Sequence, residues 1–574
     1  MSKFDIYYKK NDNSKLFSYL SEKSTNKVKS LQNYIPIYSR FFSLNETNFN
    51  KINLNHKYNI SAIKNEDDDS FNTFDVILHD QSKNKLTKKS FFKFSPLLNV
   101  TKFLAGKYKD ISQNIVRHLP KLNSSGEILK KLECCNNCAY TDSFFSYLSS
   151  QLLHYHKFSH GLDFYGSFLG IQEKFRVDIT DDLEYLYDYD FFHTNQNKLF
   201  ETDVIDESML DDDTRKNRNK IKIQGKRKIS IEKLDNSIYE GVFEELTVEN
   251  VNKMNNINNV TINDISLNES INYLRENSVK DPEEKKTNSE CSSRISNTDN
   301  EDNSESSESD YSDDSEYSSI DDCINAYVYD FPCQIICLEK LESTLDECVE
   351  NPEMKLNNKE WESCFLQIIM ILITYQKTFN FTHNDLHTNN VMFNKTEKKY
   401  LYYFYNDKYW KVPTYGKLYK IIDYGRSIYS FNDKEMISDC FFKTGDAAGQ
   451  YNFSIFKNES KSLLEPNFGF DLTRLACSLF DYFIPDMDKK IHNPIAKLVD
   501  EWVKDDNGKN LLYKSNGEER YPDFKLYKMI TRKCKKHTPD SQLNKQIFKK
   551  YICSKKKVGK KAPVINIDKM PKYF

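Results

Sequence analysis

The spacing of apolar residues predicts helices in three parts of the chain. Apolar side chains recur three and four residues apart over residues 141–155, and the same spacing runs through 360–379 and 470–480. The longest apolar stretch, residues 364–375, is about twelve residues long and is interrupted by Gln367, so it is too short to span a bilayer. We therefore expect helices that pack in the core of a soluble protein.

Short apolar runs between turn residues predict the strands. Residues 74–78 and 90–94 form two such runs on either side of a polar turn at 81–87, and Pro96 ends the second run. Further strands are expected at 161–169, at 332–339, at 420–422, and in an aromatic hairpin formed by 400–405 and 408–412. Helices and strands together predict an α+β fold.

Composition divides the chain into globular and non-globular parts. Residues 195–325 are expected to be an insertion, because 215–228 is basic and 297–322 consists almost entirely of Ser, Asp, Glu, Asn and Tyr. Such a segment cannot bury enough apolar surface to offset its ordering entropy, which predicts disorder. Residues 1–70 are polar and predict an N-terminal extension, and 551–574 predicts a lysine-rich tail.

Charge and cysteine usage exclude several classes of protein. Lys and Arg number 82 against 85 Asp and Glu, a formal net charge of -3, so no whole-chain field favours nucleic acid or a membrane. Nucleic-acid contact by the tail at 551–574 is a weaker alternative. Cys134, Cys135 and Cys138 lack a second cysteine or histidine pair that would complete a zinc site, so reduced thiols are the simpler interpretation. The polar opening, residues 1–5, does not predict a secretory signal.

Two short motifs carry the candidate chemistry. His383-Asn384-Asp385-Leu386-His387-Thr388-Asn389-Asn390 reads H-x-D-L-x-x-x-N, and Asp423-Tyr424-Gly425 follows a strand-like run further along the chain. The carboxylate of Asp385 can orient an attacking hydroxyl and accept its proton. Asn390 and Asp423 offer the hard oxygen ligands that Mg²⁺ prefers. An isolated H-x-D is often a plain turn, but the two motifs together favour phosphoryl transfer.

These motifs resemble those of the protein-kinase superfamily. The chain is similar in particular to divergent serine/threonine kinases of large nucleocytoplasmic DNA viruses. The segments that carry this resemblance are 93–98, where Lys93 opens K-F-S-P-L-L, then 144–166, 411–416 and 422–426. The resemblance covers about 330–480 and, less closely, about 74–170.

The resemblance implies a bilobal kinase fold, with a small lobe at 71–340 that carries the insertion and a mainly helical large lobe at 341–550. It implies ATP and Mg²⁺ as cofactors, protein substrates, no membrane partner, and a location in the host cytoplasm or the virion. It also implies roles for individual residues: Asp385 as catalytic base, with His387 beside it; Asn390 and Asp423 as metal ligands; Lys93 on the nucleotide phosphates; Leu338 as gatekeeper; and Glu339 to Leu341 as the hinge that binds adenine.

The sequence departs from the kinase pattern at several points. No G-x-G-x-x-G precedes Lys93, since Gly106 is the first glycine of the chain, so ATP must be covered in another way. The predicted helix at 141–155 has no glutamate to pair with Lys93. The candidates are Asp142 in that helix and, before it, Glu127 and Glu133. His387 stands where serine/threonine kinases usually have lysine, and Asn384 replaces an arginine, so activation through a phosphorylated loop that docks on that arginine is not expected.

Two other functions fit part of the pattern. Small-molecule kinases such as choline kinases and aminoglycoside phosphotransferases share H-x-D-x-x-x-x-N, although Gly425 after Asp423-Tyr424 favours a protein kinase. Haspin-like kinases also carry a histidine at the position of His387. A catalytically dead pseudokinase would explain the missing glycine loop, although all three residues of the large-lobe site are present. Serine and threonine are favoured over tyrosine as acceptors only by the resemblance.

Overall fold

The structure is a computed structural model, and it describes most of the chain outside one long internal segment. The described residues are 2–10, 12–67, 71–122, 129–204, 323–442, 444–451, 466–522, 524–559 and 562–574. The disorder predicted for 195–325 therefore falls largely on residues outside the described part. Before that segment, however, β8 (Phe200–Thr202) pairs with β9 (Asn325–Glu339), so the chain still belongs to a sheet after residue 195.

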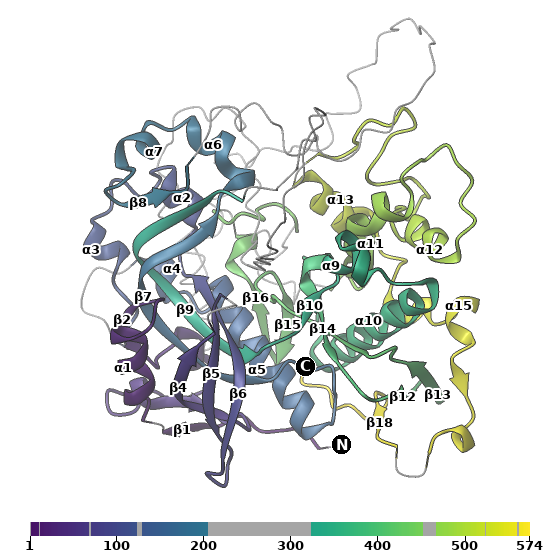
Figure 1. Cartoon of the computed structure of the whole chain (residues 1–574), viewed down its shortest axis with the longest axis horizontal. Helices are drawn as coiled ribbons and strands as arrows, with labels where there is room; N and C mark the ends of the chain where they lie inside the picture. The colour runs from purple at the N-terminus through teal and green to yellow at the C-terminus, as the bar shows by residue number, and fades with distance from the viewer. Residues whose placement is uncertain are drawn as a thin grey trace, which may run out of the picture. The chain divides into compact units, whose positions relative to one another are not determined.

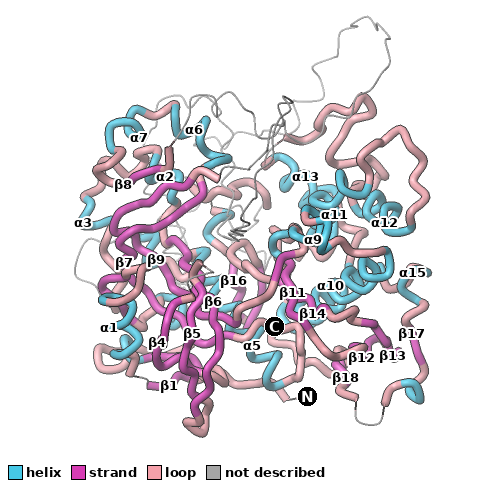
Figure 2. The backbone as a smooth tube through the Cα atoms, viewed as in Figure 1, coloured by secondary structure: helices cyan, strands magenta, loops and turns pink. Residues whose placement is uncertain are grey.

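Seven antiparallel strands form a curled sheet (Figures 1 and 2). Their order is β2-β7-β9-β6-β5-β4, and β8 joins beside β9. The remaining bounds are β2 Val28–Gln32, β4 Asn59–Glu66, β5 Thr73–His79, β6 Lys85–Pro96 and β7 Phe164–Asp178. The turn before β6 is shorter than the predicted 81–87. The reason is that Asp80 closes it, accepting hydrogen bonds from the backbone of Ser82 (2.8 Å) and Asn84 (2.9 Å).

The segment predicted as an N-terminal extension, 1–70, contributes to this sheet. It supplies β2 and β4, and helix α1 (Ser14–Glu22) buries Leu16 and Leu20. Near the chain start, β1 (Tyr8–Lys10) pairs with β3 (Ile52–Leu54). The predicted boundary at residue 70 thus differs from the structure, because the apolar residues of this segment are mixed with many polar ones and show no clear period.

Helix α5 (Cys138–Tyr155) packs against the sheet and confirms the predicted helix at 141–155. The side chain of Asn137 begins it by accepting a hydrogen bond from the Ala139 backbone at 3.1 Å. Phe145 of this helix stacks on Phe381, with ring centroids 4.4 Å apart, immediately before the motif at 383–390. The helix therefore connects the sheet with the segment that carries the candidate base.

Helix α10 (Asn358–Phe379) delivers the chain to that motif. Asn357 and Glu360 form a capping box at its start, and Asn380 ends it in the left-handed conformation, with φ 53°. The other long helices of this part are α11 (Phe470–Phe483), α12 (Pro494–Trp502) and α13 (Lys525–Lys533). In the described residues, no helix is both long and apolar enough to cross a membrane.

Short elements complete the described chain. A three-stranded sheet has the order β10-β11-β14, with β10 Ser343–Thr344, β11 Val391–Lys395 and β14 Lys417–Ile421, and β15 (Ile428–Phe431) pairs with β16 (Lys434–Ile437). The short helices are α2 Val100–Leu104, α3 Gln113–Val116, α4 Lys130–Glu133, α6 Leu183–Tyr187, α7 Asp190–Asn195, α9 Glu347–Glu350, α14 Pro539–Gln542 and α15 Gln546–Lys549.

The predicted aromatic hairpin is confirmed as β12 (Tyr400–Tyr405) and β13 (Lys408–Pro413), and it holds the end of the chain. Its two turn residues both have positive φ, as a type I′ turn requires. Strands β17 (Ile552–Cys553) and β18 (Val564–Asn566) pair with its two edges. Tyr573 is fully buried. The lysine-rich segment 551–574 is therefore anchored in a folded sheet, because the aromatic hairpin supplies an apolar surface for it.

Candidate active site

Helix α11 fixes the backbone of the loop that carries the candidate base, Asp385. Asp471, in the first turn of that helix, accepts hydrogen bonds from the backbone N–H groups of His383 and Asn384, each at 3.0 Å. Asn384 has a positive φ of 65°, a conformation that asparagine tolerates better than most residues. Asp471 thus caps the backbone of the motif, and it leaves little freedom to Asp385 next in the chain.

Asn390 lies between the base and the second motif. Its Nδ2 donates to the backbone oxygen of Asp385 at 2.8 Å and lies 3.1 Å from Nε2 of His387. The backbone oxygen of Asn390 accepts a hydrogen bond from the N–H of Ile422 at 3.1 Å. Since Ile422 directly precedes Asp423, this bond brings the two predicted metal ligands side by side.

Lys93 of β6 connects the seven-stranded sheet to the second motif. Its Nζ lies 2.7 Å from Oδ2 of Asp142 and 2.9 Å from Oδ1 of Asp423. Burial alone lowers the pKa of Lys93, but the charges of Asp142 and Asp423 outweigh it and raise that pKa above its ordinary value. Lys93 also lowers the pKa of Asp423 despite the burial of that group.

Asp142 resolves the choice left open by the sequence. Besides its ion pair with Lys93, its Oδ1 accepts a hydrogen bond from the Tyr424 backbone at 2.9 Å. Burial, together with the charge of Asp423, raises the pKa of Asp142 in spite of Lys93. Of the other two candidates, Glu133 lies at the end of α4 and Glu127 lies outside the described residues. The acid in α5 is thus an aspartate, one methylene shorter than the glutamate of the kinase pattern.

Asp385 is surrounded by groups that the sequence did not single out. Its Oδ1 accepts a hydrogen bond from the hydroxyl of Tyr527 at 2.7 Å, and its Oδ2 lies 3.8 Å from Nη1 of Arg426. The Tyr527 oxygen in turn accepts from Nε of Arg474 at 2.9 Å. Burial opposes the charge of Asp385, but Arg426, followed by His387 and Arg474, holds its pKa well below the ordinary value.

The sequence gives little indication that these three residues lie near Asp385. Arg426 directly follows Asp423-Tyr424-Gly425, so its proximity to the site could have been inferred. Arg474 lies one helical turn after Asp471 in α11, on the same side of the helix. Tyr527 lies on α13 in no recognisable motif, so only the tertiary structure identifies it.

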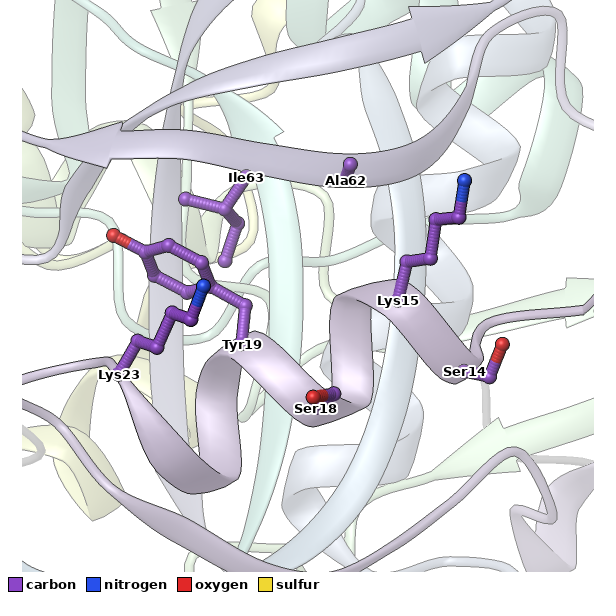
Figure 3. A pocket seen from close by; sticks show the side chains of 7 residues that line it. All are labelled: Ser14, Lys15, Ser18, Tyr19, Lys23, Ala62 and Ile63. Carbon is purple, nitrogen blue, oxygen red and sulfur yellow. The ribbon is translucent and has the colours of Figure 1, made fainter.

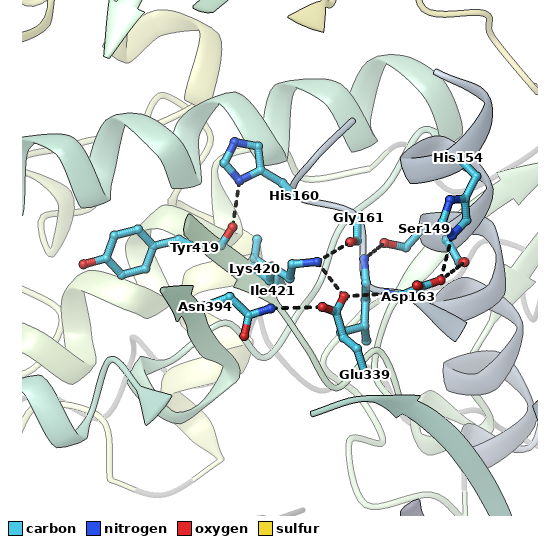
Figure 4. Close-up of polar contacts among 12 residues, drawn as sticks. Ser149, His154, His160, Gly161, Asp163, Glu339, Asn394, Tyr419, Lys420 and Ile421 are labelled. Carbon is cyan, nitrogen blue, oxygen red and sulfur yellow. Dashed lines mark hydrogen bonds and ion pairs between the residues drawn. The ribbon is translucent and has the colours of Figure 1, made fainter. Parts of the chain in front are cut away.

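The predicted hinge connects β9 with β14 through a buried ion pair. Leu338 lies in β9 between Phe91 and Phe164 of the adjacent strands, and Leu341 is buried. The carboxylate of Glu339 lies 2.5 Å from Nζ of Lys420. Figure 4 shows this pair together with its other partners: Asn394 (3.0 Å) and the Asp163 backbone (2.7 Å) donate to Glu339, and Lys420 donates to the Gly161 oxygen (2.7 Å).

The turn between β4 and β5, residues 67–72, contains no glycine. Asp67 of this turn forms an ion pair with Lys89 at 2.5 Å, and residues 68–70 lie outside the described part. Because residues 67–72 contain no glycine, this turn lacks the close backbone approach that a glycine-rich loop provides.

A shallow hollow on the small-lobe sheet is separate from this site. It lies between α1 and β4 and is lined by Ser14, Lys15, Ser18, Tyr19, Lys23, Ala62 and Ile63 (Figure 3). It contains none of the predicted site residues and no paired titratable groups of the kind found around Lys93.

Comparison with known proteins gives a partial match to kinases. No protein-family model matches the chain. Over 102 residues the chain is 35% identical to serine/threonine-protein kinase haspin of Bos taurus and, over 102 residues, 36% identical to that of Mus musculus. Each match covers 17% of this chain and 12% or 13% of the relative, so the chain spans about one eighth of the relatives' length. The similarity supports a kinase-like protein, and the viral resemblance stays a prediction.

Proposed function

We propose that this protein is a Mg·ATP-dependent protein kinase that transfers the γ-phosphoryl group to serine or threonine hydroxyls. One observation carries the proposal: Lys93 of β6 bridges Asp142 of α5 and Asp423 of the second motif at 2.7 and 2.9 Å. Protein kinases depend on an ion pair between a strand lysine and a helix acid, with the D-x-G aspartate next to that pair as a magnesium ligand.

The residues present fit magnesium and a nucleotide. Both contacts of the Asn390 amide use Nδ2, which leaves its carbonyl oxygen as the donor atom for a metal. Both contacts of Asp423 use Oδ1, so its second oxygen completes a pair of hard ligands. Magnesium commonly takes only one or two ligands from protein and the rest from phosphate and water. When bound, Mg·ATP supplies the phosphoryl group, and Lys93 offers its charge to the phosphates.

Asp385 would then act on the acceptor hydroxyl. Because its pKa is low, it is ionised and serves first as a hydrogen-bond acceptor that orients the hydroxyl. It takes the hydroxyl proton as the acceptor oxygen bonds to the γ-phosphorus, and the β–γ bridging oxygen keeps the electron pair of the bond that breaks. Most of the rate enhancement is expected from positioning and charge stabilisation. The choice of serine and threonine rests on the named relatives and the motif resemblance.

Phosphate transfer from γ-labelled ATP tests the proposal directly. The full chain with Mg²⁺ and generic protein substrates should place label on serine or threonine, and Asp385→Asn or Asp423→Ala should abolish it. Asp385→Asn should keep its folding and nucleotide affinity, because it preserves size and touches no phosphate. Asp488→Ala, a change at an exposed carboxylate, is the matched control and should keep full activity. Equal transfer by wild type and Asp385→Asn would contradict the site assignment.

A further inference from the structure

Helix α13 lies at the candidate base and at the segment after the second motif. Tyr527 of this helix donates to Asp385, as described above, and its ring stacks on Phe524 with centroids 5.2 Å apart. One residue further, Nζ of Lys528 lies 3.8 Å from the position that a Cβ would take on Gly449. These two contacts place α13 beside the base on one side and beside the segment after Asp423 on the other.

The exposed stripe of α13 is basic. Lys525, Lys528 and Arg532 are three and four residues apart, so they share one face of the helix, and Lys525 and Arg532 are exposed. Among the described residues, no ion pair is recorded for any of the three, and Lys528 instead lies over the Phe524 ring at 5.7 Å. Burial, and after it the like charge of Arg532, lowers the pKa of Lys528.

Among the described residues after Asp423, no acid forms an ion pair with this stripe. Two acids of the described segment after Asp423 are engaged elsewhere: Asp439 pairs with Lys131 at 2.7 Å, and Asp446 accepts from Asn99 at 2.7 Å. Asp385 itself already faces Arg426 and Arg474. Positive side chains therefore lie both at the base and along the adjacent helix α13.

We propose that the basic stripe of α13, formed by Lys525, Lys528 and Arg532, selects acceptor segments that carry acidic residues next to the phosphorylated hydroxyl. This inference rests on the proposed kinase function and names its substrate class. The acidic side chains of such a segment would relieve the repulsion within the stripe, and they would be drawn towards the base by its positive surroundings. A basic acceptor segment would meet like charge at the same place.

Three peptides that differ only around one serine test this selection. The serine is flanked by aspartate and glutamate, by alanine, or by lysine, and kcat/KM is measured for the full chain with Mg·ATP. We expect the acidic peptide to exceed the neutral one by about tenfold, the scale of two or three partly exposed ion pairs. The advantage should shrink when salt is raised from about 0.05 to 0.5 M, because partly exposed pairs are screened.

Reversing the charge of the stripe tests whether α13 causes the preference for acidic peptides. The double variant Lys528→Glu/Arg532→Glu should lose the acidic preference or reverse it. The control variant Lys408→Glu/Lys497→Glu makes the same charge change on β13 and α12 and should keep the preference. Equal rates of transfer to all three peptides would contradict the proposed substrate selection but not the kinase function. The same holds if the preference survives the α13 charge reversal. Absence of transfer to every peptide overturns the proposed function and the selection with it.

Discussion

The hydroxyl of Tyr527 donates a 2.7 Å hydrogen bond to Oδ1 of Asp385, the oxygen of the candidate base. The tyrosine oxygen is itself held by Nε of Arg474 at 2.9 Å. Tyr527 therefore links a partly buried arginine to the base, in a geometry that fixes the orientation of the carboxylate. Charge-assisted bonds of this kind are among the stronger ones.

Tyr527→Phe should lower kcat by about tenfold to a hundredfold while the KM for ATP stays unchanged, because a loosened base misaligns the acceptor. Loss of the bond also removes support for the ionised carboxylate, so the acidic limb of the pH–rate profile should move to higher pH. Tyr521→Phe, which removes a hydroxyl bonded to Lys533, is the control. A rise in activity would instead mean that Tyr527 blocks the acceptor position.

The ion pair between Lys93 and Asp142 should govern nucleotide binding. In Asp142→Asn the amide oxygen still accepts from the Tyr424 backbone, so the variant removes charge with little change of shape. Lys93 would then be drawn to Asp423 alone, and we expect the KM for ATP to rise about tenfold, a loss of about 1.4 kcal/mol. Asp75→Asn on β5 is the matched control. An unchanged KM for ATP would show that Lys93 needs no helix partner.

The hinge pair predicts a strong effect on stability. Side chains of Glu339 and Lys420 are 16% and 3% exposed, so Glu339→Gln leaves a buried ammonium with no carboxylate at 2.5 Å. Removing one partner of a buried pair typically costs about 3–5 kcal/mol in the free energy of unfolding. Denaturant unfolding of Glu339→Gln, Lys420→Met and the double variant measures this. The double variant should lose less free energy of unfolding than the two single variants lose together. Strict additivity would show that the pair is not coupled.

His160 should contribute to acid sensitivity. Its ring nitrogens contact the Tyr419 backbone oxygen and the Tyr403 hydroxyl, each at 2.7 Å, and burial lowers the pKa of His160 to about 4. In the unfolded chain an ordinary histidine takes up a proton below about pH 6.5. The folded state thus loses up to about 3 kcal/mol of stability as the pH falls from 6.5 to 4.

Urea unfolding at a series of pH values tests this contribution. His160→Gln should lose less free energy of unfolding than the wild type between pH 6.5 and 4. Part of the loss should remain, because burial also lowers the pKa values of His56 and His156 to about 4. His118→Gln changes an exposed histidine and should leave the slope as it is. An unaltered slope in His160→Gln would contradict the assignment.

Local sequence determined the elements and the main chemistry. The helices α5, α10 and α11 follow from apolar periodicity, and the turn at Asn406-Asp407 follows from residues that accept positive φ. The roles proposed for Asp385, Asn390 and Asp423 were predicted because each motif keeps its residues within a few positions, so neighbours in sequence are neighbours in space.

Only the tertiary structure decided which distant residues complete the site. Asp142 partners Lys93 because α5 packs against the sheet in one orientation, a choice that the periodicity of the helix leaves open. Tyr527 reaches Asp385 across 142 positions of the chain. The ends of the chain join the fold in the same way, since Tyr573 stacks on Phe379. Such contacts depend on how buried surfaces fit together, and no local pattern of residues encodes that fit.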